Sequence, residues 1–275
     1  MPFTVSHVAA VLPLARTRLP LAALAVGAVV PDLPYYLPMP SLGTHAPWGL
    51  PVDVVLGAAV LLVVRTAVRE PVAALAPRTV RERIPAAPAP LTRRHAAAAG
   101  AALLIGAATH ILWDSVTQPG GAGVQLLPAL QASVVGPHRV YNVLMYVSSA
   151  GGLAALAVWA RLRLRATPPA ERPVAALRPA ARWCAVAAVA LASAAGAVAL
   201  GMSPRAAVSS YDLVRCVLVG AMQGAGAGLA GHVAVWHLVR AARRIGGSGG
   251  VGEPGARGDR RSTEKTSRRV ADSSR

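Results

Sequence analysis

Residues 96–116 read AAAAGAALLIGAATHILWDSV, and their only ionisable side chains are one His and one Asp. As an α-helix, about 20 residues of this kind cross the roughly 30 Å hydrocarbon core of a bilayer. Four more stretches have a similar length and character: 49–68, 140–160, 182–200 and 213–239. Transmembrane strands would instead alternate apolar and polar residues over about ten positions. We therefore predict an all-α integral membrane protein with about five transmembrane helices.

The composition of the whole chain agrees with a membrane setting. Of its 275 residues, 54% are hydrophobic and 14% are charged, whereas soluble domains carry about 25% charged residues. A soluble protein would need more charge than this to cover its outside. Most of the hydrophobic surface must therefore face lipid.

The net charge of +17 is distributed unevenly along the chain. Of the 28 basic residues, 23 lie in three segments, 65–94, 161–182 and 240–275. The connections 118–139 and 201–212 carry only one Arg each. Because Lys and Arg are retained on the cytoplasmic side, this alternation predicts a multi-pass protein of the inner (plasma) membrane with a cytoplasmic C-terminus. A nucleic-acid partner, which high positive charge can also indicate, is not expected from this placement.

Composition also divides the chain into a membrane domain, 1–240, and a basic tail, 241–275. The tail is rich in Gly, Ser, Arg and Lys and has few apolar residues, so we expect it to be disordered. Its charge would be attracted to anionic lipid headgroups at the cytoplasmic face. The predicted partners are therefore the lipid bilayer and these headgroups.

A stripe of glycines marks the last predicted helix. Gly220, Gly224 and Gly228 follow one another at four-residue spacing, which lets a second helix approach closely. We favour packing within the bundle, and a homo-oligomer is the alternative.

The N-terminal segment 8–30 allows two interpretations. Its apolar pieces, 8–14 and 19–30, are each too short to cross a bilayer alone, and Arg16 and Arg18 separate them. Either 19–30 crosses as a sixth short helix, or the two pieces form a re-entrant hairpin. Non-helical backbone is tolerated at membrane depth where protein covers it. The two arginines favour the crossing.

Ionisable side chains in membrane segments are costly and are functional-site hypotheses by default. His110 and Asp114 are four residues apart and so share a helical face. The predicted topology gathers them near the outer face with four further residues: Asp32, His45, Asp53 and His138. Imidazoles and carboxylates together suit a divalent metal, above all zinc. From spacing alone, a metal site and a structural His110–Asp114 pair have equal weight.

Several short motifs have a distinctive arrangement over residues 1–240. They are MPFTVSH at 1–7, LAVG at 24–27 followed by Pro31-Asp32, His45, HILWDS at 110–115, and Ser148-Ser149 followed by Gly151-Gly152. This arrangement resembles domain-of-unknown-function family 4184, a family of bacterial membrane proteins. More remotely it is similar to the membrane-bound metal-dependent hydrolases. The resemblance implies a metal site made of His7, Asp32, His45, His110 and Asp114.

One position departs from the family pattern, which usually has His where this chain has Gln118. Because Gln is a poor zinc ligand, either that His is dispensable or the site is weakened here. If His7 belongs to the site, the N-terminus must lie on the outer side, and for this reason we adopt the hairpin.

The resulting hypothesis is a membrane-embedded, metal-dependent hydrolase whose site opens at the outer face. Zinc or another divalent metal would activate water, and Asp114 or Asp32 would orient it. A phosphoester of a lipid or envelope metabolite is the expected substrate class. The alternatives are a non-catalytic membrane scaffold or assembly protein and, less favoured because no repeats or broken helices are evident, a transporter.

Overall fold

The computed structural model describes residues 3–37, 39–40, 42–86 and 92–248. Within these residues, five helices are long and apolar enough to cross a membrane: Pro47–Leu75, Arg93–Leu126, Val140–Ala166, Pro179–Gly201 and Ser210–Ile245. Each of them contains one of the five predicted spans, so the predicted all-α membrane fold is confirmed. Contacts divide the chain into two units, Met1–Trp236 and His237–Arg275, and the arrangement described below is that of the first.

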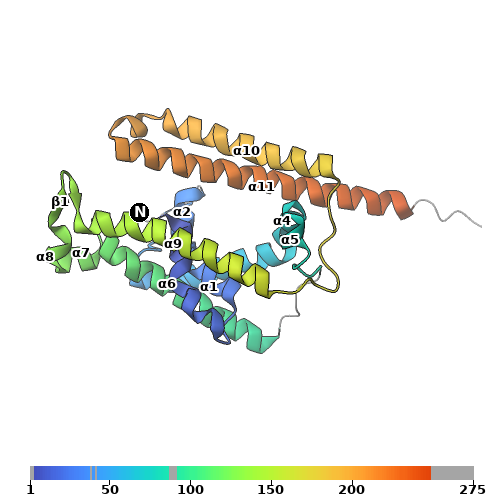
Figure 1. The fold of residues 1–275 in the computed structure, drawn as a ribbon, viewed down its shortest axis with the longest axis horizontal. Helices are drawn as coiled ribbons and strands as arrows, with labels where there is room; N and C mark the ends of the chain where they lie inside the picture. The colour runs from blue at the N-terminus through green and yellow to red at the C-terminus, as the bar shows by residue number, and fades with distance from the viewer. Residues whose placement is uncertain (1–2, 38, 41, 87–91, 249–275) are drawn as a thin grey trace, which may run out of the picture. The chain divides into compact units, whose positions relative to one another are not determined.

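The five spans are built from the longer helices of the chain (Figure 1). The first begins with a 3₁₀ turn, η3 (Pro47–Gly49), and contains α3 (Leu50–Val63), a π-helical stretch (Val64–Val68) and α4 (Arg69–Leu75). The second is α6 (Arg93–Thr117), extended by α7 (Ala122–Leu126). The remaining three are α9 (Val140–Ala166), α10 (Pro179–Gly201) and α11 (Ser210–Ser248).

Short elements connect these helices. α5 (Arg78–Arg81) follows α4, α8 (Pro128–Gln131) follows α7, and η5 (Pro204–Ala207) precedes α11. In the part of the chain that the structure describes, the strands are β1 (Ser133–Val135) and β2 (His138–Arg139), an antiparallel pair between α8 and α9. Gly136 makes the tight turn between them with a φ of 52°, a conformation that glycine adopts without steric cost.

The N-terminal segment is a hairpin. A 3₁₀ helix, η1 (Thr4–Arg16), turns at Thr17 into α1 (Leu21–Gly27), which leads to η2 (Val30–Asp32) and α2 (Leu33–Tyr36). Thr17 stabilises the turn, because its hydroxyl donates to Leu14 O and accepts from Leu19 N. The two ends of the hairpin return to the same place, where His7 and Asp32 both reach side chains of α6. The segment 8–30 therefore folds back on itself, whereas its re-entrant placement in the membrane stays a prediction.

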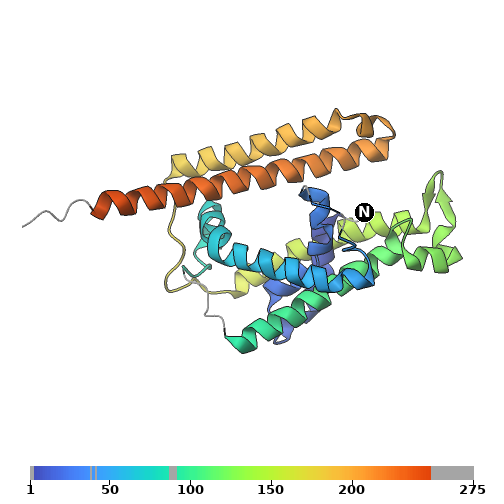
Figure 2. The ribbon, with the colours of Figure 1, turned by 180° about the vertical axis from the view of Figure 1, so that it is seen from behind.

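Glycine allows α1 and α6 to touch backbone to backbone. A Cβ on Gly106 would lie 2.4 Å from Leu24 O, and one on Gly27 would lie 2.3 Å from Leu103 O. The core around this contact consists of Val11, Ala23, Leu24, Ala28, Ala102 and Leu103. Figure 2 shows α6 from behind, with the N-terminal hairpin lying across it. This packing holds the N-terminal hairpin against the helix that carries His110 and Asp114.

The last two spans, α10 and α11, lie side by side (Figures 1 and 2). A Cβ on Gly220 would lie 2.1 Å from Gly196 O, and one on Gly224 would lie 2.0 Å from Ala192 O. The predicted glycine stripe therefore packs within the chain. α11 continues past residue 240, where we predicted the tail to begin, to Ser248. Residues 249–275, most of the tail predicted to be disordered, lie outside the described residues.

Candidate metal site

His110 is held in one orientation by the backbone of the hairpin. It is fully buried on α6, one turn after Gly106, and its Nδ1 lies 2.8 Å from Ala28 O. A carbonyl can only accept a hydrogen bond, so Nδ1 carries the proton. The lone pair of Nε2 is then free to face the cluster. A second ring nitrogen bound to a carbonyl in this way is what orients metal-binding histidines.

Asp32 enters from the end of η2 and is also fully buried. Its Oδ2 accepts a hydrogen bond from Thr4 Oγ1, and that hydroxyl in turn lies 2.7 Å from Tyr36 OH. Because the Thr4 proton is used on Asp32, Tyr36 is the donor to Thr4. The chain Tyr36–Thr4–Asp32 fixes the carboxylate and leaves Oδ1 facing the histidines.

His45 lies in the segment between α2 and α3. The preceding residue, Thr44, is buried and its hydroxyl donates to Pro31 O at 2.8 Å, which ties this segment to η2. The side chain of His45 is 30% exposed, compared with 8% or less for the side chains of Asp32, His110 and Asp114. Water or a ligand can therefore reach the cluster from the side on which His45 lies.

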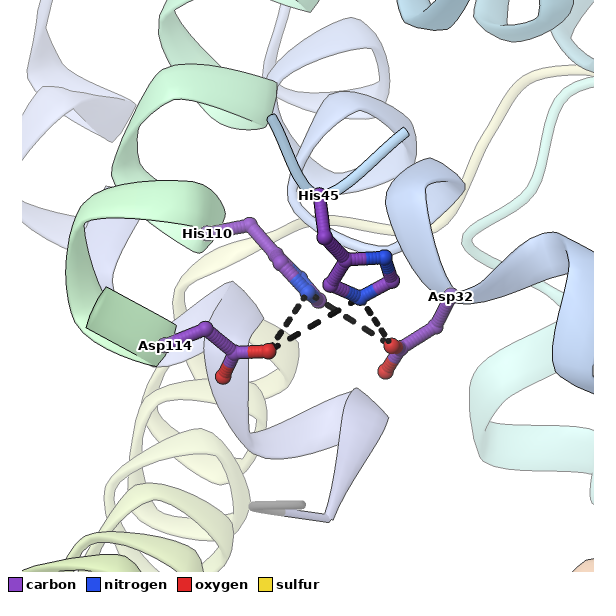
Figure 3. A group of neighbouring side chains, drawn as sticks. All are labelled: Asp32, His45, His110 and Asp114. Atoms are coloured by element: carbon purple, nitrogen blue, oxygen red, sulfur yellow. Dashed lines mark hydrogen bonds and ion pairs between the residues drawn. The ribbon is translucent and has the colours of Figure 1, made fainter. Parts of the chain in front are cut away.

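Four ligand-type atoms converge from these elements: Asp32, His45, His110 and Asp114 each offer one, all within 4.8 Å of one another. Figure 3 shows the four side chains pointing toward a common centre. His45 Nε2 lies 3.0 Å from Asp32 Oδ1 and 3.8 Å from Asp114 Oδ2. His110 Nε2 lies 3.6 Å and 3.5 Å from the same two oxygens. Donors around a tetrahedral zinc ion lie roughly 3.3–3.6 Å from one another, so the cluster could hold a metal ion.

The charges of the cluster also call for a cation. Among the described residues, the ion-pair partners of Asp32 and Asp114 are all histidines. Burial raises the pKa of Asp32, but the nearby ring of His110 and the hydrogen bonds with His45 and Thr4 outweigh burial and keep its pKa below the usual value. Two nearly buried carboxylates need compensating charge, which a protonated histidine or a metal ion would supply, because buried charges are paired or bind metals.

His7 lies beside the four residues. Its ring stacks on that of His110 with 3.9 Å between centroids, and its Nε2 is 3.5 Å from Asp114 Oδ1. Neither ring nitrogen has a hydrogen-bond partner among the described residues. Burial, and then the neighbouring His110, lower the pKa of His7 to about 4. A neutral imidazole therefore lies beside the second oxygen of Asp114.

Three other residues that we singled out lie elsewhere. Asp53 is fully buried on α3, and neither of its carboxylate oxygens has a partner among the described residues, but it is not one of the four converging ligands. His138 is exposed on β2, with its ring 5.7 Å from that of Tyr146. Gln118 follows α6 directly, and its buried Nε2 has no hydrogen-bond partner in the part of the chain described.

Sequence reasoning missed the residues that hold the ligands in place: Thr4, Thr44 and Tyr36. Thr4 and Thr44 are buried polar residues in segments without helical periodicity. Hydroxyl residues are common in such segments. Thr4, Thr44 and Tyr36 find their hydrogen-bond partners only because segments that are distant in the sequence come together in the fold. The Met-Pro-Phe-Thr motif at the start of the chain was the one signal that pointed at Thr4.

Comparison with known proteins identifies a family for this chain. The family model described as Domain of unknown function (DUF4184) matches residues 1–235. No curated protein and no solved structure matches. The matched range includes all five residues of the site predicted from the resemblance.

Proposed function

We propose that this chain, which belongs to the DUF4184 family, is a membrane-embedded hydrolase that uses a divalent metal ion. The observation that carries the proposal is the convergence of Asp32, His45, His110 and Asp114 in a nearly buried place without an arginine or lysine partner among the described residues. In the predicted topology this site opens toward the outer face.

Zinc is the first candidate for the ion. The cluster offers two imidazole nitrogens and two carboxylate oxygens, a mixed set that zinc accepts at close to tetrahedral geometry. The four N–O distances of 3.0–3.8 Å are near the edges of such a tetrahedron. Manganese, which prefers carboxylate and water ligands, is the second candidate.

The chemistry would divide between the ion and the chain. When bound with an open position, a divalent ion lowers the pKa of water toward neutrality and so supplies a nucleophile. Asp114 Oδ1 has no hydrogen-bond partner among the described residues, so it can accept a proton from an incoming water and orient it. His7 Nε2, 3.5 Å from that oxygen, can hydrogen-bond to the same water and help to orient it. Asp32, fixed by Thr4, keeps the opposite side of the cluster in place.

A structural metal site is the second candidate function. Structural zinc sites have four protein ligands, whereas catalytic sites usually have three and keep one position open. The cluster has four protein ligands. They link three parts of the chain: the N-terminal hairpin, the segment that precedes α3, and the helix α6. This count favours a scaffold whose fold the metal holds together.

The test is hydrolysis by metal-loaded protein that has been purified in detergent. Wild type is offered a phosphate monoester, a phosphate diester and a carboxylic ester, each with a chromogenic leaving group and each in an amphiphilic form. The proposal predicts turnover of at least one class by wild type, and its loss in Asp114→Asn and His7→Gln. Stoichiometric metal without turnover of any of these esters would instead favour the structural site.

A further inference from the structure

A largely apolar pocket lies next to the metal cluster. It has a volume of about 220 Å³ and is lined by the N-terminal residues Phe3 and Thr4, by Tyr36 of α2, and by residues of α9 and α11. Val214 and Leu218 of α11 line it and are 57% and 46% exposed. On a membrane-spanning helix such side chains face lipid, so the pocket can be reached from the hydrocarbon of the bilayer.

The pocket and the metal cluster share a wall. Thr4 lines the pocket, and its hydroxyl donates to Asp32 on the other side; Tyr36, which also lines the pocket, binds the same hydroxyl. α11 is tied to this wall as well, because Gln223 Nε2 lies 3.3 Å from Tyr35 O. The ring of Tyr35 contacts that of His45 with 5.3 Å between centroids. Thr4 therefore separates a molecule in the pocket from the candidate ligand Asp32.

Among the described residues that line this pocket, Arg215 is the charged one. It is in the second turn of α11, inside the candidate span Ser210–Ile245. Among the described residues it has no hydrogen bond or ion pair. The nearest acidic residue in the sequence, Asp212, is engaged with Ser209, whose hydroxyl donates to it at 2.6 Å. Arg215 is exposed, and charged residues in membrane spans commonly pair with an opposite charge, so this guanidinium at an apolar pocket can pair with an anion that comes with the ligand.

We propose that this pocket binds a phosphorylated lipid, with its hydrocarbon against the apolar residues of α9 and α11 and its phosphate between Arg215 and the metal cluster. Guanidinium groups bind phosphate oxygens through paired hydrogen bonds, and the apolar lining suits an alkyl chain. The binding claim stands on the pocket itself, whereas the role of the lipid as substrate rests on the proposed function. In that role, water oxygen bonds to phosphorus, the bond from phosphorus to the lipid oxygen breaks, and the proton of water passes to that oxygen. The products are phosphate and the lipid alcohol.

The test is binding to the full-length protein in a neutral detergent, measured by titration with three probes. Lysophosphatidic acid has both the chain and the phosphate, a monoacylglycerol with the same acyl group has only the chain, and inorganic phosphate has only the charge. Lysophosphatidic acid should bind at least about tenfold more tightly than either of the others. Similar affinity for the monoacylglycerol would overturn the role of Arg215, and similar affinity for phosphate alone would overturn the role of the pocket.

Variants identify the residues responsible. Arg215→Gln should weaken lysophosphatidic acid binding by about tenfold or more, the loss expected when one charge-assisted contact is removed. Arg205→Gln, which removes the exposed arginine of η5, should leave it unchanged. Leu218→Trp, which fills the pocket, should also weaken binding and covers the case in which Arg215→Gln does not fold. Unchanged binding in folded Arg215→Gln or in Leu218→Trp would refute the proposal.

The same titration on His110→Ala separates the two proposals. If His110→Ala binds lysophosphatidic acid as wild type does and Arg215→Gln weakens that binding, but wild type does not hydrolyse the lipid, then the pocket stands and the hydrolase does not. If wild type hydrolyses a phosphoester and the affinity of Arg215→Gln is unchanged, then the hydrolase stands and the pocket assignment is wrong.

Discussion

Hydroxyl groups and backbone carbonyls hold three of the four candidate ligands. Ala28 O fixes His110, Thr4 fixes Asp32, and the bond from Thr44 to Pro31 O positions the segment that carries His45. Such partners set the orientation and basicity of ligands, and their loss typically costs 10–100-fold in metal affinity. They therefore allow a test of the metal site that leaves every proposed ligand intact.

Thr4→Val is the sharpest of these changes. Valine has nearly the shape of threonine but cannot donate to Asp32 or accept from Tyr36. We expect zinc affinity to fall by about 10–100-fold, as measured by competition with a chromogenic chelator, while the helical circular dichroism stays the same.

Thr109→Val is the matched control. Thr109 lies next to His110 but donates to Gly106 O of its own helix, so this variant should keep the wild-type affinity. Equal affinities for all three proteins would mean that Asp32 is not a ligand.

At the scale of elements, close approach between α1 and α6 places the site. The backbone contact at Gly27 and Gly106 brings Ala28 O to His110 and carries the hairpin to α6. A similar backbone contact between glycines, at Gly196 and Gly220, joins α10 to α11. Small residues are the means by which helices pack in membranes, where burial from water gives no driving force between them.

Gly106→Ala should therefore damage both stability and metal binding. Its Cβ would lie 2.4 Å from Leu24 O and 2.7 Å from Ala28 N, so the two helices must separate. We expect a loss of about 1–3 kcal/mol, as for other overpacked contacts, seen as a lower melting temperature, together with weaker zinc binding because Ala28 O moves away from His110.

Gly100→Ala controls for the general effect of alanine in the same helix. A Cβ there meets nothing within 4 Å, and alanine is the better helix former by about 1 kcal/mol. Its melting temperature should equal or exceed that of wild type. A Gly106→Ala protein as stable as Gly100→Ala would show that α1 and α6 do not touch as described.

The sequence predicts the elements better than it predicts their contacts. All five long spans could be found from apolar length alone, because a bilayer demands that length of every crossing helix. The segment 8–30 could not be decided, because the charges of Arg16 and Arg18 and the position of His7 pointed to opposite answers. His110 and Asp114 followed from helical spacing, and Asp32 and His45 from topology and resemblance. A role for Arg215 was not predicted, because a single arginine near the end of a span has no periodic or motif signal.

At the scale of the whole molecule, the distribution of charge predicts the orientation in the membrane. The arginine-rich segments 65–94 and 161–182 lie at one end of the spans, and the connections with one Arg each at the other. Lys and Arg are retained on the cytoplasmic side. The account therefore predicts that the metal cluster, whose residue Asp114 is near the arginine-poor end of α6, lies toward the outer face.

Cysteine labelling in intact cells measures this orientation. After Cys184 and Cys216 are replaced by serine, single cysteines in 118–139 or 201–212 should react with a membrane-impermeant thiol reagent. Cysteines in 71–90 or 246–275 should react only after the cells are opened. The reverse pattern would invert the molecule and place the site at the cytoplasmic face.

The central claim is that Asp32, His45, His110 and Asp114 hold a metal ion. The most direct measurement is the metal content, by plasma mass spectrometry, of protein purified without chelators and incubated with zinc or manganese. Wild type should contain about one ion per chain, and His110→Ala and Asp114→Ala, still inserted and helical, should contain almost none. A metal-free wild type would contradict the account. In that case His110 and Asp114 are a structural pair, and each single variant should lose thermal stability that their joint replacement by apolar residues restores.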